Sequence, residues 1–181
     1  MIRILIDTTV LCGAIRSHRG VDMRLLMLAR LGFYEPVITQ EIVAEWVGKC
    51  RSGFGKPRIQ YPPEIVEEFC DLLVPLLSPE MIRNVALGRA GGPLNPILKK
   101  GGKTIIQVPA RQAHSGTAAI GGDTLALKDI SDLHVIQAAI QYGCRYLCTY
   151  NKKDFPEGLS FGEVRFVAPE RLVGLLTGGS A

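Results

Sequence analysis

The stretch from residue 130 to residue 149 is the part of the sequence that most restricts the fold. Apolar residues recur at helical spacing from Ile130 to Tyr142, and Gly143 ends that pattern. The next segment, Arg145–Thr149, has the apolar character of a short buried strand. A helix that leads into a buried strand through one glycine is typical of α/β folds, in which the strands are mostly parallel.

The same alternation of short apolar runs and amphipathic segments extends over most of the chain. The patterns predict strands over Arg3–Ile6, Pro36–Thr39 and Glu163–Ala168, and helices over Val21–Leu31, Gln40–Cys50 and Pro169–Leu176, with further helices that begin after Asp7, at Pro63 and at Ser78. We therefore expect an α/β fold, a three-layer α/β/α sandwich around a parallel sheet. Ligands of such sheets bind beyond the carboxyl ends of the strands.

Residues 88–124 differ in composition from the rest of the chain. Glycines and prolines interrupt every periodicity there, and only Thr104–Val108 has the pattern of a strand. The stretch contains no acidic residue between Glu80 and Asp123, and its basic residues are Arg89, Lys99, Lys100, Lys103 and Arg111. We expect one domain over residues 1–181 with a Gly/Pro-rich basic insertion at about 88–124. That insertion could be an arm that contacts phosphates, a loop folded over the sheet, or a disordered segment.

Composition and charge exclude several classes of protein. No run of about 18 apolar residues is present, and Asp7 interrupts the apolar stretch at the N-terminus, so we expect neither a membrane span nor a signal peptide. A cytoplasmic protein is the resulting expectation. The five cysteines are scattered without a C-x-x-C pair, which favours reduced, buried thiols over a zinc site. The net charge of +4 permits a polyanionic partner without requiring one.

Four acidic residues stand where this architecture would bring them together. Asp7 and Asp154 follow predicted strands, Glu45 lies in a predicted helix, and Asp132 opens the helix that precedes Arg145–Thr149. Carboxylates that gather in one place repel one another unless protons or a cation neutralise them. Oxygen ligands without His or Cys select a hard cation such as Mg²⁺ or Mn²⁺, which can orient a phosphate and activate water for phosphodiester hydrolysis.

Each of these acids also has an ordinary structural explanation. Asp7 and Asp132 stand where helix N-caps are expected, and Ser131 is an equally good cap. Glu45 could be a solvated helical residue, and Asp154 could belong to a simple turn. The residues that compete for the second and third positions are Glu41 and Asp129. The prediction of one site therefore depends on the coincidence of the acids with strand ends.

Three segments resemble the conserved blocks of PIN domains. They are LIDTTVL at residues 5–11, VITQEIVAEW at residues 37–46 and DISDLHVIQAAIQYGCRYLCTYNKKDF at residues 129–155. The resemblance implies that Asp7, Glu45, Asp132 and Asp154 are the catalytic acids and the ligands of Mg²⁺ or Mn²⁺. It also implies that Thr8, Thr149 and Asn151 are polar neighbours of the scissile phosphate. Thr9 and Asn151 depart from the family pattern, which more often has Asn and an acid there.

The resemblance implies a metal-dependent endoribonuclease that leaves a 5′-phosphate and a 3′-hydroxyl on RNA. It suggests a homodimer and, if the chain is the toxin of a toxin–antitoxin pair, a small antitoxin protein. The alternative is a PIN-like module that binds nucleic acid or protein without cutting. A metal-dependent phosphatase is a third hypothesis, against which Thr9 stands where a second aspartate would be expected. We also expect Trp46 in the core and His134 at the core or its rim.

Overall fold

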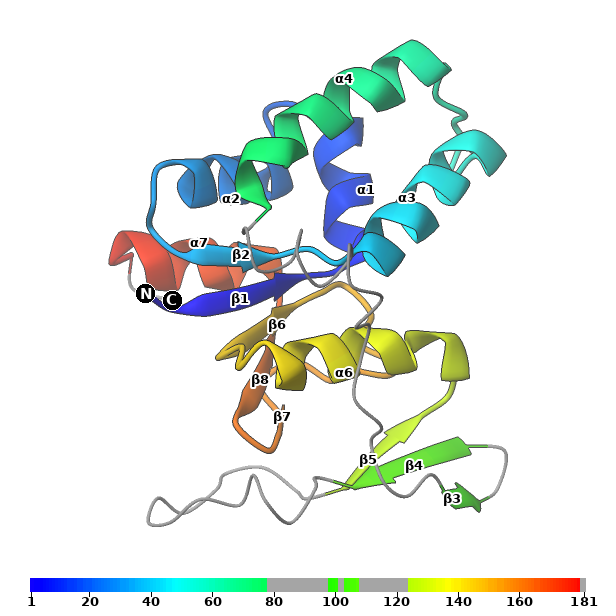
Figure 1. Cartoon of the computed structure of the whole chain (residues 1–181), viewed down its shortest axis with the longest axis vertical. Helices are drawn as coiled ribbons and strands as arrows, with labels where there is room; N and C mark the ends of the chain where they lie inside the picture. Colours follow the sequence, from blue (N-terminus) through cyan, green and yellow to red (C-terminus); the bar gives the residue numbers. More distant parts are fainter. Residues whose placement is uncertain (78–97, 101–102, 108–123, 180–181) are drawn as a thin grey trace.

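The main sheet of the protein has five strands in the order β2-β1-β6-β8-β7 (Figure 1). The structure of the protein is a computed structural model that describes residues 1–77, 98–100, 103–107 and 124–179. The strands are β1 (Arg3–Ile6), β2 (Glu35–Val37), β6 (Tyr146–Cys148), β7 (Ser160–Phe161) and β8 (Val164–Val167). The first four strands of that order run parallel, and β7 pairs antiparallel with β8 at the edge. The expectation of a mostly parallel sheet is therefore confirmed.

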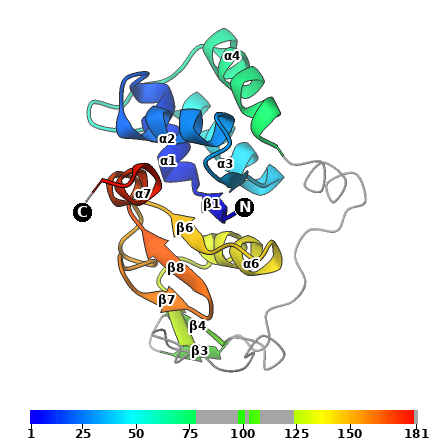
Figure 2. The ribbon, with the colours of Figure 1, turned by 90° about the vertical axis from the view of Figure 1, so that its left-hand side faces the viewer.

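Helices cover both faces of this sheet. They are α1 (Thr8–Arg16), α2 (Val21–Arg30), α3 (Gln40–Ser52), α4 (Pro63–Leu73), α6 (Leu133–Gln141) and α7 (Pro169–Thr177), with 3₁₀ turns η1 (Val74–Leu76) and η3 (Ile130–Asp132). Figure 2 shows α6 on one side of the sheet and α7 on the other, while α1, α2 and α3 gather beside the end that holds β1. This is the α/β/α layering that the sequence predicts.

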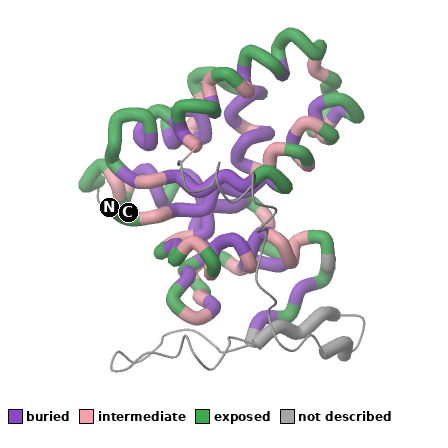
Figure 3. The backbone as a smooth tube through the Cα atoms, viewed as in Figure 1, coloured by how far each residue is buried: buried purple, intermediate pink, exposed green. Residues whose placement is uncertain are grey.

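The core explains why the sequence of β1 is a continuous apolar run. Ile4, Leu5 and Ile6 of β1 are completely buried, because helices lie over both faces of the sheet (Figure 3). Trp46 is also fully buried and packs its ring 5.0 Å from that of Phe69, which confirms its predicted place in the core. Trp46 follows Glu45 directly, so the core contact of the one residue helps to fix the direction of the other.

One predicted boundary and one predicted region need correction. The strand predicted over Pro36–Thr39 ends at Val37, because the hydroxyl of Thr39 accepts the N–H of Ile42 and caps α3. The region with one predicted strand, Thr104–Val108, instead contributes to a separate antiparallel sheet. Its strands are β3 (Leu98–Lys100), β4 (Lys103–Gln107) and β5 (Thr124–Leu127). The short strands β3, β5 and β7 were missed, because two to four residues show too little alternation to identify a strand.

Part of the predicted insertion lies outside the described residues. The helix predicted from Ser78 and the basic residues Arg89 and Arg111 belong to that part. Lys99, Lys100 and Lys103 fall within β3 and β4. From β5 the chain enters η3 and then α6, so the described end of the insertion leads directly to Asp132 (Figure 1).

Two further sequence expectations can be compared with the described residues. None of the described helices has the length and apolar character that crossing a membrane would require. All five cysteines are free thiols, and each except Cys70 is buried. Burial raises the pKa of Cys12 to about 12 and that of Cys144 to about 12, so these thiols stay protonated at neutral pH. The prediction of reduced, mostly buried cysteines is confirmed.

Helices α1 and α2 approach closely at Gly13 and Asp22. The Asp22 side chain is only 6% exposed, and within the described part of the chain its Oδ1 atom has no hydrogen-bond partner. A methyl group built on Gly13 would lie 1.8 Å from Oδ2 of Asp22. The glycine therefore provides the space that this buried carboxyl occupies.

We expect Gly13→Ala to lower the free energy of unfolding by about 1–3 kcal/mol, because overpacking at a buried contact displaces its neighbours. The matched control is Gly48→Ala in α3, where an added methyl group meets no atom within 4 Å. That change should stabilise the protein by about 0.5–1 kcal/mol through helix propensity alone. Urea unfolding monitored by circular dichroism gives both values. Equal stability of the two variants would contradict the close contact.

The pH dependence of the free energy of unfolding should show the contribution of the buried Asp22 carboxyl. Burial raises the pKa of its carboxyl to about 6, assisted by the charge of Glu170 and opposed by a hydrogen bond with Tyr150. An acid whose pKa is higher in the folded state favours folding when protonated, and this contribution disappears as the pH rises through about 6. We expect the contribution to fall by about 1 kcal/mol between pH 5 and pH 8 and to be absent in Asp22→Asn. Urea unfolding of both proteins at the two pH values measures it, and identical pH profiles would contradict the assignment.

Candidate active site

Asp7 lies where β1 ends and α1 begins, at the carboxyl edge of the sheet. Its side chain is 5% exposed, and its backbone N–H donates to the carbonyl of Cys148 on the neighbouring strand β6 (3.1 Å). Carboxylate Oδ1 accepts the N–H of Thr8 at 2.7 Å, so Asp7 is the N-cap of α1. The structural explanation considered from the sequence is therefore correct for one of its two oxygens.

The second oxygen of Asp7 is held by two hydroxyl groups. Oδ2 accepts hydrogen bonds from Thr9 Oγ1 at 2.7 Å and from Thr149 Oγ1 at 2.6 Å. Thr149 follows β6 directly, so this bond joins the ends of two adjacent strands. From the sequence, Thr9 was considered as a departure from a family pattern and as an argument against a phosphatase, and its contact with Asp7 was missed. Together these donors keep a buried carboxylate in one orientation.

Glu45 reaches the same edge from α3. Its Oε2 accepts the hydroxyl of Thr8 at 2.8 Å, and its Oε1 lies 2.5 Å from the ammonium of Lys49. Burial alone would raise the pKa of Glu45, but bonds from Lys49 and Thr8 and the charge of Lys49 lower it overall. Glu41, the competing residue, is exposed on the first turn of α3. The partnership with Lys49 was missed, although its i,i+4 spacing from Glu45 was a readable signal.

Asp132 stands at the junction of η3 and α6. It occupies the N-cap position of α6, yet its side chain forms no capping bond. Its Oδ2 instead accepts the amide of Asn151 at 2.7 Å. Burial raises the pKa of Asp132 to about 6, with further increases from the charges of Asp154 and Asp7. Asp132 is thus electrostatically coupled to acids that come from other segments of the chain.

The other acid near η3 has a local role. Asp129 is exposed, and its Oδ1 accepts the N–H of Ser131 at 2.9 Å, as a turn residue does. The ring of His134 contacts the carbonyl of Ser131 through Nδ1 at 2.6 Å and approaches Glu45 Oε2 through Nε2 at 3.7 Å. His134 is partly exposed, at the rim that the sequence predicts, and it connects α6 to the Glu45 side of the site.

Asp154 is buried behind Asp132 and supports the backbone. Its Oδ1 accepts the N–H groups of Lys128 and Asp129, the latter at 3.3 Å, and the residue is 4% exposed. Its own N–H donates to the Asn151 side chain at 3.4 Å. The carboxylate therefore holds the segment that leads to Asp132, while its charge contributes to the raised pKa of that residue.

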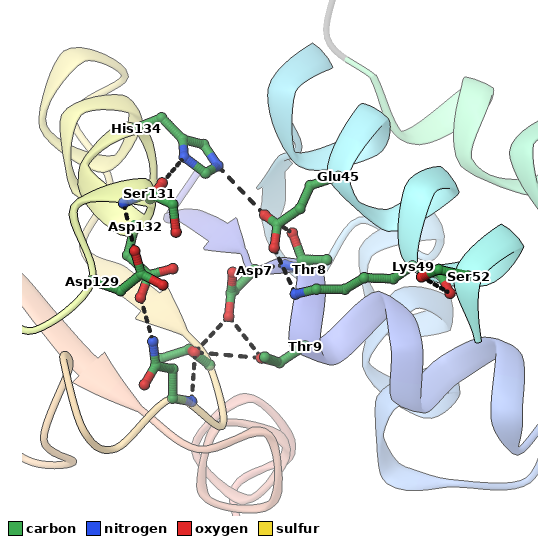
Figure 4. A network of polar contacts seen from close by, with 12 residues as sticks. Asp7, Thr8, Thr9, Glu45, Lys49, Ser52, Asp129, Ser131, Asp132 and His134 are labelled. Atoms are coloured by element: carbon green, nitrogen blue, oxygen red, sulfur yellow. Dashed lines mark hydrogen bonds and ion pairs between the residues drawn. The ribbon is translucent and has the colours of Figure 1, made fainter. Parts of the chain in front are cut away.

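Asn151 lies in the loop that follows β6 and forms hydrogen bonds with Thr149, Asp132 and Asp154. Its side-chain N–H donates to Asp132, and its backbone N–H donates to Thr149 Oγ1 at 2.9 Å. Its side-chain oxygen Oδ1 accepts the backbone N–H of Asp154. Figure 4 shows the result: Asp7 lies between Glu45, which comes from α3, and Asp132, which comes from the opposite side. Residues that are distant in sequence thus face one common space.

The donors that surround this space have the chemistry of a Mg²⁺ or Mn²⁺ site. The side chains of Asp7, Glu45 and Asp132 offer only oxygen, which favours a hard cation over zinc. Within the described segments, no three Asp, Glu, His or Cys side chains form a closed metal-binding group. Mg²⁺ commonly uses one or two carboxylates and keeps several waters, so an open arrangement of acids fits that ion.

Comparison with known proteins gives one match. A family model described as PIN domain matches residues 3–153, which include Asp7, Glu45 and Asp132 and end one residue before Asp154. Searches of curated proteins and of solved structures gave no match. The match covers most of the 181-residue chain and every strand of the main sheet except β7 and β8.

Substitution of Asp154 should affect stability in proportion to the acceptors that it removes. We expect Asp154→Ala to lower the free energy of unfolding by about 2–3 kcal/mol, because two backbone N–H groups lose their acceptor. Asp154→Asn keeps one acceptor oxygen and should lower it by about 1 kcal/mol. The control is Asp71→Ala, at an exposed acid of α4, which should change stability by less than about 0.5 kcal/mol. Urea unfolding measures all three, and wild-type stability of Asp154→Ala would refute a supporting role.

Proposed function

This chain belongs to the PIN domain family, a family of nucleases that generally use divalent metal ions, and from that premise we propose that it is a Mg²⁺- or Mn²⁺-dependent endoribonuclease. One observation carries the proposal. Asp7 at the end of β1, Glu45 from α3 and Asp132 before α6 face one common space (Figure 4), and burial together with the charges of Asp154 and Asp7 raises the pKa of Asp132 to about 6. Acids from separate segments that act on one another in this way form a site whose negative charge a cation would neutralise.

The residues that would hold the ion are Asp7, Glu45 and Asp132, with Asp154 as the fourth acid that the family resemblance assigns. Bound there, a divalent ion supplies Lewis acidity toward a phosphate, orientation of the substrate, and stabilisation of the charge that develops during hydrolysis. Asp154 has one oxygen engaged with the backbone N–H groups of Lys128 and Asp129. Its part in the site is therefore mainly to hold the backbone of the segment that carries Asp132 and to add negative charge beside that residue.

The chain's own residues orient the acids before substrate arrives. Thr9 and Thr149 direct their hydroxyl hydrogens to Asp7, and Thr8 directs its hydrogen to Glu45. Thr8 and Thr149 are 1% and 3% exposed, so their contacts support a positioning role more than direct contact with the scissile phosphate. Preorganised ligands reduce the rearrangement that metal binding and catalysis require.

Asn151 and Lys49 are the groups best placed to meet the RNA backbone. Asn151 is partly exposed and already donates to Asp132, so its amide lies at the rim of the acids. Lys49 brings a positive charge to the opposite rim, with 41% of its side chain exposed. A cation beside the carboxylates lowers the repulsion that a phosphate would otherwise meet there.

The finer biological setting is part of the same proposal. By resemblance to the toxin branch of the family, the nuclease would act in the cytoplasm on RNA, pair with a second copy as a homodimer, and be covered by a small antitoxin protein. The support for this setting is the resemblance of the sequence blocks. Co-expression with a short protein encoded beside this chain, followed by co-purification, would test it.

One observation favours the alternative of a PIN-like module that binds nucleic acid without cutting. The ammonium of Lys49 lies 2.5 Å from Glu45 and already neutralises one of the acids. If Lys49 keeps that place, the remaining acids would bind a divalent ion weakly. The assay described next separates the two functions, since a binding module retains RNA but leaves it intact.

The nuclease proposal predicts metal-dependent cleavage of single-stranded RNA. We expect fragments with 5′-phosphate and 3′-hydroxyl ends in Mn²⁺ or Mg²⁺ and intact RNA in EDTA. Asp7→Asn should reduce kcat/KM about a hundredfold or more, because even the loss of outer contacts to metal ligands often costs 10–100-fold. The matched control is Asp71→Asn, at an exposed acid of α4. Intact RNA in Mn²⁺, together with RNA binding that Asp7→Asn leaves unchanged, would reject the nuclease and support the binding module.

A further inference from the structure

Tyr150 is an exposed aromatic residue between two residues of the candidate site. Thr149 before it donates to Asp7, and Asn151 after it donates to Asp132. Thr149 is 3% exposed, whereas Tyr150 is 37% exposed. The chain therefore turns its polar side chains toward the acids and presents a large aromatic ring at the surface directly beside them.

Hydrogen bonds hold Tyr150 both at its backbone and at its side-chain hydroxyl. Its backbone N–H donates to Thr9 Oγ1 at 3.1 Å, and Thr9 in turn donates to Asp7. Its hydroxyl donates to Glu170 Oε1 on α7 at 3.0 Å. The Asp22 carboxyl on α2 is a second partner of that hydroxyl and is itself buried. The backbone of Tyr150 is thus tied to α1 and its hydroxyl to α7 and α2, while the residue stays 37% exposed.

The protonation state of this hydroxyl supports the anchoring. Burial, together with the nearby carboxylates of Asp22 and Glu170, raises the pKa of Tyr150 above its usual range. The phenol therefore remains a neutral donor at physiological pH. Since its O–H is engaged with carboxylates, the part of the side chain that remains available to a ligand is the ring itself.

A fixed and exposed aromatic ring is suited to stacking on a nucleobase. Stacking on a mobile side chain loses part of its free energy to conformational ordering, whereas a ring that is already anchored loses less. Bases in single-stranded RNA are free to stack on aromatic side chains, while bases in a duplex are already stacked and paired. Tyr150 is adjacent in sequence to Thr149 and Asn151, whose side chains contact Asp7 and Asp132, and its own N–H contacts Thr9, so its backbone lies beside the candidate site.

We propose that Tyr150 is a stacking platform for a nucleobase beside the scissile phosphate. This inference rests on the proposed nuclease function and adds a substrate-binding residue to it. Glu170 is a positioning residue in this view, since it acts by holding the Tyr150 hydroxyl. The stacking contact uses the ring face and so tolerates any base.

The first test is RNA binding in EDTA, measured by fluorescence anisotropy with a labelled single-stranded oligonucleotide. Tyr150→Ala should weaken binding about tenfold, the range expected when one base loses its aromatic partner. Tyr150→Phe keeps the ring and should stay within about threefold of wild type. The matched control is Phe33→Ala, which removes an aromatic ring that is 50% exposed away from the site. Equal affinity of Tyr150→Ala and Phe33→Ala would overturn the proposal.

The second test distinguishes stacking from a structural effect. Steady-state cleavage in Mn²⁺ should show a raised KM for Tyr150→Ala with kcat changed little, and Glu170→Gln should show a smaller increase in KM. On RNA with an abasic nucleotide beside the mapped cleavage position, wild type and Tyr150→Ala should become equal. A loss of the same size on normal and abasic RNA would overturn stacking. If wild type binds RNA but does not cleave it, the nuclease fails while the anisotropy result still decides the role of Tyr150. No RNA binding by wild type would overturn both.

Discussion

A carboxylate that is buried away from water must accept hydrogen bonds from the protein, and Asp7 does so at the point where β1 ends. One oxygen accepts the backbone N–H of Thr8 and so begins α1, and the other accepts the hydroxyls of Thr9 and Thr149. The same residue therefore follows the end of β1, starts α1 and connects to β6. The remaining acids are arranged around this fixed charge, so the hydrogen bonds that Asp7 accepts organise both the fold and the site.

The second organising constraint is repulsion among the acids. The structure balances it in different ways at different positions: Lys49 neutralises Glu45, and the Asn151 amide donates to Asp132. Burial and neighbouring charges still leave the pKa of Asp132 raised to about 6. An added cation would relieve this repulsion, which is the physical link between the buried acids and the chemistry proposed for them.

Much of the fold could be read from local patterns. Arg3–Ile6 was recognisable because a strand covered on both faces is apolar at every position, and the helix before Tyr146 was recognisable from its spacing and Gly143. The strands β3, β5 and β7 were not recognisable, because their pairing depends on partners elsewhere in the chain. The end of β2 was misplaced by two residues because Thr39 serves α3 instead.

By itself, the sequence determined the alternation of strands and helices, since this follows from periodicity and residue type. It also placed Asp7 after a strand, Glu45 within a helix and Asp132 at a helix start. Only the tertiary structure decided what each carboxylate contacts. In the folded chain, Thr149 donates to Asp7, Thr8 donates to Glu45, and the backbone N–H groups of residues 128–129 donate to Asp154. A hydrogen bond between groups far apart in sequence depends on the packing of whole elements, and no local pattern of residues specifies that packing.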